Sequence, residues 1–242
     1  MNNIGLIDIH THIMSGMDDG ARNTAEELEM LKQEYAGGVR SVILTPHYNE
    51  RSKFIKNPRE GLTRIKEAAS CIGPDFKIYQ GNEIYYTENT VKLLESGKAL
   101  SMADSRYVLV EFYFGAPYQR IFAGIQELVL HGYWPVLAHA ERYVSLVHEK
   151  GGAQRLRMAG AYIQVNAGSF TERGLRTKIF VESLVKKGHI DFIGSDCHNM
   201  TSRPPNMNGC MNKIERKYGE DAAWRLFFEN PSKILNNVRL PR

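Results

Sequence analysis

Short apolar runs rich in β-branched residues alternate along this chain with longer segments of helical periodicity. Runs of this length and composition are typical of buried strands, and a helical pattern after each of them is typical of βα units. The pattern predicts strands at residues 5–10, 39–45, 76–81, 107–112, 135–139, 161–165 and 190–195. Strands that alternate with helices in this way indicate an α/β fold with a parallel sheet.

Helix signals fill the intervals between the predicted strands. Asn23 or Thr24 begins the first helix, because Thr24 and Glu27 fit a capping box, and Pro58 stands at the first position of the second. Further helical patterns cover 117–130, 146–159, 172–187, 207–218 and 220–229, with a last turn after Pro231. A (β/α) barrel and a doubly wound open sheet both fit this order. The first strand is not followed by GxGxxG, which weighs against a dinucleotide-binding open sheet.

Composition and charge narrow the class of protein. The 242 residues contain no Pro-rich linker, low-complexity segment or internal repeat, so we expect a single domain over residues 1–242. The net charge of +4 is spread along the chain, so nucleic-acid binding is not expected, and the apolar runs are too short for membrane insertion. The N-terminus does not resemble a signal peptide. Cys71, Cys197 and Cys210 lack CxxC spacing, so we expect reduced thiols and a cytoplasmic location.

Side chains that can hold metal ions fall in one kind of place along the sequence. Six of the seven predicted strands end in a His, Asp or Glu or are followed closely by one. The exception is the strand that ends in QVNAGS. These residues are His10, His12, His47, Glu83, Glu111, His139, Asp196 and His198. In barrel enzymes the active site lies at the C-terminal ends of the strands. One such residue alone is usually structural, but eight at strand ends predict a metal centre.

The residue types and spacing indicate which metal chemistry to expect. His10 and His12 are two apart on a strand, so they face the same side and can bind one ion together. Ligands of the His, Asp and Glu type without Cys favour zinc, manganese or iron. Eight ligands exceed the needs of one ion, and a carboxylate such as Glu83 can bridge two. The sequence therefore predicts two or three divalent ions.

Several motifs occur together in a specific order: DIHTHI, MDDGA, TPHY, GNEIYYT, VEF, AHAERY and SDCHN…RPP. From Ile7 to about Pro231 the chain resembles the metal-dependent tyrosine-protein phosphatases of bacterial capsule and exopolysaccharide clusters, the CpsB/CapC family. That family belongs to the polymerase and histidinol phosphatase (PHP) superfamily. The resemblance implies a distorted (β/α)7 TIM-like barrel with three divalent ions, usually manganese, with iron or zinc as alternatives.

The resemblance also implies roles for particular residues. Carried over by position, three groups of ligands result: His10, His12, Glu83 and Asp196 for one ion; Glu83, Glu111 and His139 for the second; and Asp19, His47 and His198 for the third. Arg142 and Arg203 match residues that contact the phosphate. Tyr85 and Tyr86 beside Glu83 either stack on the substrate's ring or pack the barrel rim.

The expected reaction is hydrolysis of phosphotyrosine on a protein, and by the resemblance that protein is the tail of a bacterial tyrosine autokinase that controls polysaccharide synthesis. Metal ions would supply hydroxide at neutral pH, and the arginines would neutralise the phosphoryl oxygens. Two alternatives stay open. One is a phosphatase for a small ester such as histidinol phosphate, and the other is a metal-binding scaffold without activity.

A thiol mechanism is a further possibility to be weighed, because Cys-x5-Arg occurs at Cys197–Arg203 and again at Cys210–Arg216. Tyrosine phosphatases of that kind need a thiolate and a loop whose backbone N–H groups surround the phosphate. The first stretch contains no glycine and includes the ligand candidate His198, and the second has a helical pattern. We therefore expect no catalytic role for either cysteine.

Overall fold

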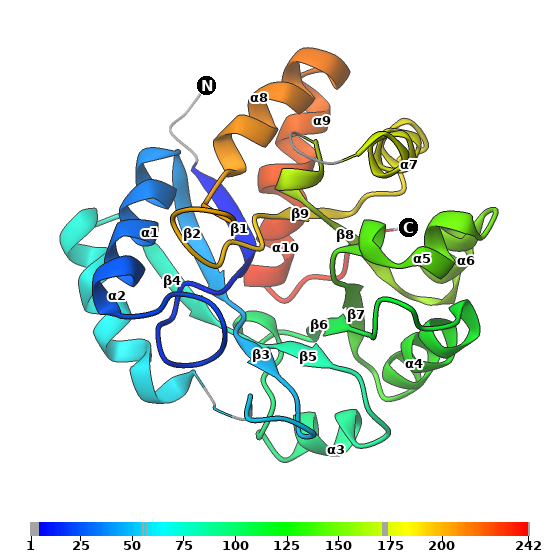
Figure 1. The fold of residues 1–242 in the computed structure, drawn as a ribbon, viewed down its shortest axis with the longest axis horizontal. Helices are drawn as coiled ribbons and strands as arrows, with labels where there is room; N and C mark the ends of the chain where they lie inside the picture. The colour runs from blue at the N-terminus through cyan, green and yellow to red at the C-terminus, as the bar shows by residue number, and fades with distance from the viewer. Residues whose placement is uncertain (1–4, 55, 57, 171–173, 242) are drawn as a thin grey trace.

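The computed structural model describes residues 5–54, 56, 58–170 and 174–241. Its strands pair in parallel and curl into a barrel that the helices surround (Figure 1). One sheet has the order β1 (Leu6–Thr11), β2 (Val39–Leu44) and β4 (Lys77–Gln80). The other has the order β3 (His47–Tyr48), β5 (Glu83–Tyr85), β6 (Tyr107–Glu111), β7 (Trp134–Leu137), β8 (Tyr162–Asn166) and β9 (Phe192–Gly194).

All seven predicted strands are confirmed, and two short strands that were not predicted, β3 and β5, follow β2 and β4 after a break in the chain's strand structure. Thr45 and Pro46 separate β2 from β3, and Gly81 and Asn82 separate β4 from β5. Asn82 fixes both breaks, since its Nδ2 donates to the Pro46 carbonyl at 3.0 Å and its Oδ1 accepts from the Leu100 N–H at 3.0 Å. After the breaks, β3 pairs with β5 and β5 with β6, which carries the sheet onward around the barrel.

The barrel closes between β1 and β9. The N–H of Asp196 donates to the His10 carbonyl at 2.8 Å, and the N–H of His12 donates to the Cys197 carbonyl at 2.9 Å. Gly194 permits this close approach, because a Cβ there would lie 2.6 Å from the Cβ of His10. The (β/α) barrel is therefore confirmed over the doubly wound sheet.

The helices lie outside the barrel at α1 (Thr24–Ala36), α2 (Arg59–Ile72), α3 (Thr90–Glu95), α4 (Tyr118–Leu130), α5 (Val144–His148), α6 (Gly152–Ala159), α7 (Leu175–Lys186), α8 (Met207–Tyr218), α9 (Glu220–Trp224) and α10 (Asn230–Leu235). Asn23 caps α1 through a hydrogen bond from the Glu26 N–H at 3.0 Å. Within the described ranges no helix is long and apolar enough to cross a membrane.

Two helix predictions need correction, and one helix was not predicted. The single helix over 146–159 was wrong, because Gly151 adopts a left-handed φ of 69° and separates α5 from α6. The turn after Pro231 is instead part of continuous helix, in which a π-helical segment at Arg225–Glu229 joins α9 to α10. The short helix α3 was not predicted. The predicted start at 172 lies outside the described residues, which show α7 from Leu175.

The barrel interior is apolar at one end and polar at the other. Ile7 and Ile9 of β1 pack against Tyr107, Phe192 and neighbouring side chains inside the barrel. Asp8 lies between them in sequence and is hydrogen-bonded to Glu34 of α1. The pairing of β1 with β2 is irregular between Asp8 and Thr11. A shift of one residue reverses the face of a strand, so this irregularity lets His10 and His12 enter the interior beyond Ile9.

Candidate metal centre

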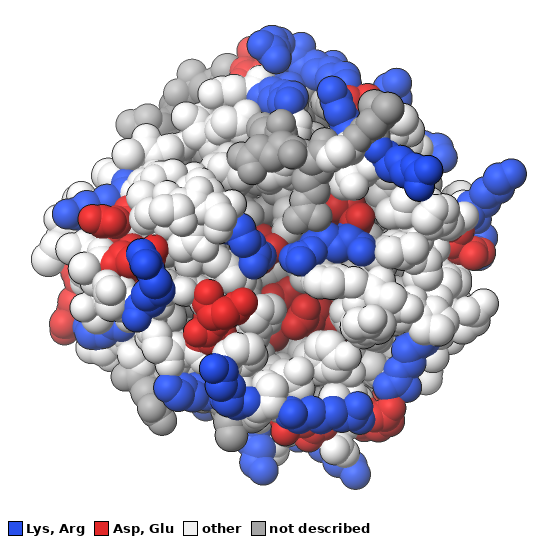
Figure 2. Space-filling model, viewed as in Figure 1, with Lys and Arg blue, Asp and Glu red and all other residues white. Residues whose placement is uncertain are grey.

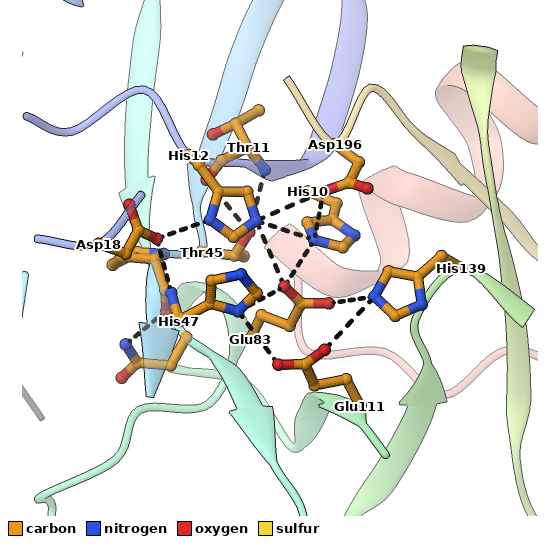
Figure 3. Close-up of polar contacts among 12 residues, drawn as sticks. His10, Thr11, His12, Asp18, Thr45, His47, Glu83, Glu111, His139 and Asp196 are labelled. Atoms are coloured by element: carbon orange, nitrogen blue, oxygen red, sulfur yellow. Dashed lines mark hydrogen bonds and ion pairs between the residues drawn. The ribbon is translucent and has the colours of Figure 1, made fainter. Parts of the chain in front are cut away.

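Glu83 stands at the centre of a cluster of imidazoles at the C-terminal ends of the strands (Figure 3). Its side chain is fully buried. Its Oε2 lies 3.3 Å from the Nε2 atoms of both His10 and His12 and 3.0 Å from Nδ1 of His47. Its Oε1 lies 2.7 Å from Nε2 of His139. One carboxylate therefore faces four imidazoles from three different strands or strand ends.

Three of the histidines are held in a defined tautomer by a partner on their Nδ1. His10 Nδ1 lies 3.2 Å from the Gln164 Oε1, His12 Nδ1 lies 2.6 Å from Asp18 Oδ2, and His198 Nδ1 lies 3.0 Å from the Asp196 carbonyl. Each partner is an acceptor, so each Nδ1 carries a proton and each Nε2 is the nitrogen left to bind a cation. The Nε2 atoms of His10 and His12 then face each other at 3.2 Å. This is the arrangement of imidazoles that bind a cation.

Several buried polar atoms of the cluster have no hydrogen-bond partner among the residues that the structure describes. They are both carboxylate oxygens of Glu83, Nδ1 of His47, Nδ1 of His139 and Nε2 of His198. The ion-pair distances around Glu83 are short, but their angles are not those of hydrogen bonds. Buried polar atoms are normally satisfied, so converging lone pairs without partners fit coordination of metal ions.

The electrostatics around Glu83 hold protons where metal ions would otherwise bind. Burial lowers the pKa of His47 and His139, but the Glu83 charge and the close contacts with the Glu83 and Glu111 carboxylates outweigh this effect. The pKa rises to about 10 for His47 and to about 9 for His139. Burial and the nearby charge of His12 instead lower the pKa of His198 to about 2. Protons and cations thus compete for the same nitrogen atoms of His47 and His139.

The two aspartates of MDDG have different surroundings. Asp19 is 58% exposed, and its Oδ1 lies 3.5 Å from Nε2 of His47 and 3.6 Å from Nε2 of His198. Asp18, which sequence reasoning did not single out, is buried and accepts from His12 Nδ1 and from the His47 N–H at 2.8 Å. Burial raises the pKa of Asp18, but the charge and hydrogen bond of His12 dominate and lower it to about 2. Asp18 therefore orients two imidazoles.

Glu111, His139 and Asp196 complete the cluster. Glu111 Oε1 lies 3.1 Å from Nδ1 of His47, and its Oε2 lies 3.7 Å from Nε2 of His139. Asp196 Oδ1 lies 3.4 Å from Nε2 of His10 and 3.5 Å from Nε2 of His12. Both His139 and Asp196 have positive φ, at 34° and 55°. Such backbone strain in residues other than glycine is concentrated at functional sites.

Both predicted arginines lie beside Asp196. Arg203 Nη2 is 2.5 Å from Asp196 Oδ2, and Arg142 Nη1 is 3.6 Å from the same oxygen. The Arg142 guanidinium also lies over the Phe114 ring, with its Cζ 4.1 Å from the ring centroid. The Phe114 ring makes an edge contact with the His139 ring, at a centroid distance of 5.4 Å. Phe114 therefore supports a cation and a cluster histidine at once.

The predicted sixth strand, which carries no His, Asp or Glu, contributes to the site through amides. Gln164 accepts from the His139 N–H at 2.6 Å and from His10 Nδ1, and Asn166 donates to Asp196 Oδ2 at 2.5 Å. Both are buried on β8 and are two residues apart, so they face the same side. Their spacing within an apolar strand was a signal that the search for His, Asp and Glu passed over.

A cavity of about 280 Å³ opens from the cluster to solvent. Its lining includes Asp19, His47, Glu83, Glu111, His139, Asp196, both arginines, Tyr85, Phe112, Tyr113 and Phe114. We name it the reaction cavity. Figure 2 shows acidic and basic side chains meeting in a hollow at the centre of this face. Tyr85 lines the cavity, whereas Tyr86 is buried and donates a hydrogen bond to Glu127. Tyr85 is thus placed where it can stack on the ring of a substrate, whereas Tyr86 packs the rim of the barrel.

The cysteines do not have the properties of nucleophiles. Cys197 is fully buried, and burial, together with the charges of Glu34 and Asp8, raises the pKa of its thiol well above the ordinary value. Cys210 is also buried, on α8, and burial raises its pKa. Thiolate formation at neutral pH is disfavoured at both positions, as expected from the sequence.

Comparisons with known proteins agree with this geometry. The family model for capsular polysaccharide synthesis, CpsB/CapC, matches residues 6–236. Tyrosine-protein phosphatase CpsB of Streptococcus pneumoniae is 33% identical over 95% of this chain and 98% of its own length. Tyrosine-protein phosphatase YwqE of Bacillus subtilis is 30% identical over 98% of this chain and 94% of its own.

Solved structures agree as well. A crystal structure from work on YwqE of B. subtilis and CpsB of S. pneumoniae, described there as metal-dependent tyrosine phosphatases, superposes with a TM-score of 0.89. It is 29% identical and covers 98% of this chain and 97% of that one. An organophosphorus hydrolase of Deinococcus radiodurans is only 11% identical, with a TM-score of 0.65, and shows the fold alone. This chain belongs to the CpsB/CapC family of capsular polysaccharide synthesis.

Proposed function

We propose that this chain is a metal-dependent protein-tyrosine phosphatase of the CpsB type. The observation that carries the proposal is the set of imidazoles and carboxylates around Glu83, with buried lone pairs that lack partners, beside two arginines in an open cavity. Relatives that match nearly the whole length of the chain are named tyrosine-protein phosphatases. One domain of this size, residues 1–242, would carry the whole activity.

We propose three divalent ions in this cluster, with manganese as the native metal and iron or zinc as alternatives. The proposed ligand groups are those implied by the resemblance, and they share Glu83: His10, His12, Glu83 and Asp196; Glu83, Glu111 and His139; and Asp19, His47 and His198. Ligand atoms of the first group lie within 4.8 Å of one another, as do those of the third together with His12. His and carboxylate ligands suit these metals.

Divalent ions bound in such a site polarise phosphoryl oxygens and activate water for attack on phosphorus. The residues of the chain supply the rest. Arg142 and Arg203 line the reaction cavity, where the planar N–H groups of a guanidinium would neutralise non-bridging oxygens. Tyr85, Tyr113 and Phe114 give the cavity an aromatic wall for the tyrosine ring. The phenolate that leaves has a pKa of about 10, so it needs less protonation than an alkoxide.

The proposed substrate is the phosphorylated tail of a bacterial tyrosine kinase that controls capsule or exopolysaccharide synthesis. The reaction cavity opens to solvent, so it can receive a tyrosine from a flexible segment. The cysteines Cys71, Cys197 and Cys210 are all free thiols, which is compatible with a reducing compartment where such a kinase tail would lie.

The test is phosphate release from a phosphotyrosine peptide after chelator treatment and after return of manganese. We expect activity to disappear with the chelator, to return with manganese and to be lost in His139→Ala. Cys197→Ser and His148→Ala, a histidine outside the cluster, should retain activity. Protein that binds manganese but releases no phosphate from any tyrosine peptide would contradict the proposal. Turnover of histidinol phosphate instead would then indicate a small-molecule phosphatase, and no turnover of either would indicate a scaffold.

A further inference from the structure

A second cavity, of about 300 Å³, lies next to the reaction cavity, and we name it the flanking cavity. Of the residues that the structure describes, Arg142, Asp196 and Arg203 alone line both cavities. None of the cluster imidazoles lines the flanking cavity, whose other walls include Asn166, Ser169, Ser202 and Asn206. The two arginines therefore form a partition between a cavity with metal ligands and one without.

The flanking cavity has an excess of positive charge. Arg142 and Arg203 are its cations, and Asp196 is its one acidic group among the described residues. Asp196 directs Oδ1 at the Nε2 atoms of His10 and His12, so its negative charge is shared with the metal cluster. Each guanidinium has further N–H groups beyond its contact with Asp196, and such groups suit a carboxylate or a phosphate.

Its neutral walls also favour an anion. Asn206 is the N-cap of α8, and its side chain makes no capping hydrogen bond, so N–H groups of the first turn are available beside the cavity. The buried Oδ1 of Asn206 has no partner among the described residues, and rotation of the amide can present N–H groups in its place. Ser169 also borders a small pocket lined by Lys178, Lys213, Lys217 and Glu182, whose charges sum to a positive excess, so the positive character continues outward.

We propose that the flanking cavity binds a second anionic group, a carboxylate or a phosphate, carried by the same peptide beside the phosphotyrosine. The proposal rests on the function proposed above. The aromatic wall of Tyr85, Tyr113 and Phe114 holds the tyrosine ring in the reaction cavity, and the arginine partition brings the flanking cavity next to the phosphate. Residues one or two positions away along an extended peptide reach about 4–7 Å, which suits adjacent cavities.

The test compares phosphotyrosine peptides that differ only by Glu or Gln at one position before or after the phosphotyrosine. We expect kcat/KM to be about 5-fold or more higher for Glu than for Gln on one side, because a charge-assisted pair replaces a neutral contact. Asn206→Asp and Ser202→Asp place a negative charge in the flanking cavity and should reduce the ratio to about one or below. Asn212→Asp, on the exposed part of α8, should keep it.

Asp is as good an N-cap as Asn, and Ser202 is exposed, so both variants should fold. A ratio of one for the unmodified protein at every position would overturn the proposal, as would a preference that survives both variants. Binding of matched peptides with a non-hydrolysable phosphonate tests the cavity separately. If no phosphotyrosine peptide is hydrolysed, the proposed function fails, but the Glu-to-Gln ratio in binding still decides the inference. A further pair of peptides carries phosphotyrosine or tyrosine, in place of Glu or Gln, next to the phosphotyrosine that is hydrolysed. Comparison of this pair with the Glu and Gln pair shows whether the cavity prefers a phosphate or a carboxylate.

Discussion

Asp18 determines how His12 presents its lone pair to the cluster. It accepts from His12 Nδ1 at 2.6 Å and from the His47 N–H at 2.8 Å. Replacing it by Asn removes the charge that favours the Nδ1–H tautomer, and the amide can present an N–H group instead. We expect Asp18→Asn to weaken manganese binding about 10- to 100-fold, measured by competition with a chelator of known affinity. The exposed Asp221→Asn serves as control, and equal affinities in the two variants would contradict this role.

The positions of the ligand candidates were predictable, but their partners were not. Parallel strands bring their C-terminal ends to one rim, so spacing alone placed His10, Glu83 and Asp196 together. Whether Asp18 or Asp19 contacts a given imidazole depends on the path of the loop. The sequence does not indicate that path, because the two adjacent residues are both aspartates. Gln164 and Asn166 were missed because amides in a strand have no charge or metal affinity of their own to draw attention.

Glu34 and Asp8 form a buried pair of carboxyl groups next to Cys197. Asp8 accepts from the backbone N–H groups of His10 and Ser195, so it is the better anion, and Glu34 keeps the proton. Burial, and then the Asp8 charge, raise the pKa of Glu34 well above its ordinary value of 4.5. The folded state therefore takes up a proton, and stability present below the ordinary pKa is lost as pH rises through the folded one.

Glu34→Gln should remove this dependence and keep a donor toward Asp8. We expect the free energy of unfolding at pH 8 to exceed that of the unmodified protein by roughly 1 kcal/mol, with a smaller difference at pH 5. Denaturant unfolding at both pH values measures it. Glu29→Gln, elsewhere on the same helix, is the matched control. If Glu34→Gln were less stable than the unmodified protein at both pH values, the buried Glu34 carboxyl would not be the cause of the loss of stability at high pH.

The broken strands β2–β3 and β4–β5 place Glu83 and His47 side by side in register. Asn82 holds both breaks through the Pro46 carbonyl and the Leu100 N–H. In Asn82→Leu these buried groups lose their partners, so we expect a loss of about 2–3 kcal/mol in unfolding free energy. Weaker manganese binding should accompany it, because Glu83 is the next residue. Asn212→Leu on the surface of α8 is the control. Unchanged metal affinity in Asn82→Leu would show that the strand breaks do not determine the geometry of the metal cluster.

Elements with long periodic patterns were predictable, and short ones were not. Strand β3 spans two residues and β5 spans three, too few for a period of two to be visible. Pro46 and Gly81, residues that often interrupt strands, were visible in the sequence. Whether such a residue ends a strand or only bends it depends on the neighbouring strand. Gly151 similarly interrupted a helical pattern that continued on both sides, and its positive φ decided the outcome.

The balance between protons and metal ions extends to the stability of the whole barrel, because the cluster joins β1, β3, β5, β6 and β7 with the segment after β9. Without metal, the raised pKa values of His47, about 10, and His139, about 9, mean that the folded state binds protons more tightly than the unfolded chain. Their contribution to stability is complete below the ordinary pKa of 6.5 and is lost as pH rises through 9 to 10.

Metal ions bind the deprotonated imidazoles, so their contribution grows over the same range of pH. We therefore expect the melting temperature of chelator-treated protein to fall between pH 7 and pH 10, while that of manganese-loaded protein falls less. The gap between the two should widen with pH, and calorimetry at pH 7.5 should show protons released when manganese binds. His47→Gln removes one of the imidazoles whose pKa is raised and should reduce both effects. A gap that narrows as pH rises would mean that Glu83 does not hold these protons in the metal-free barrel.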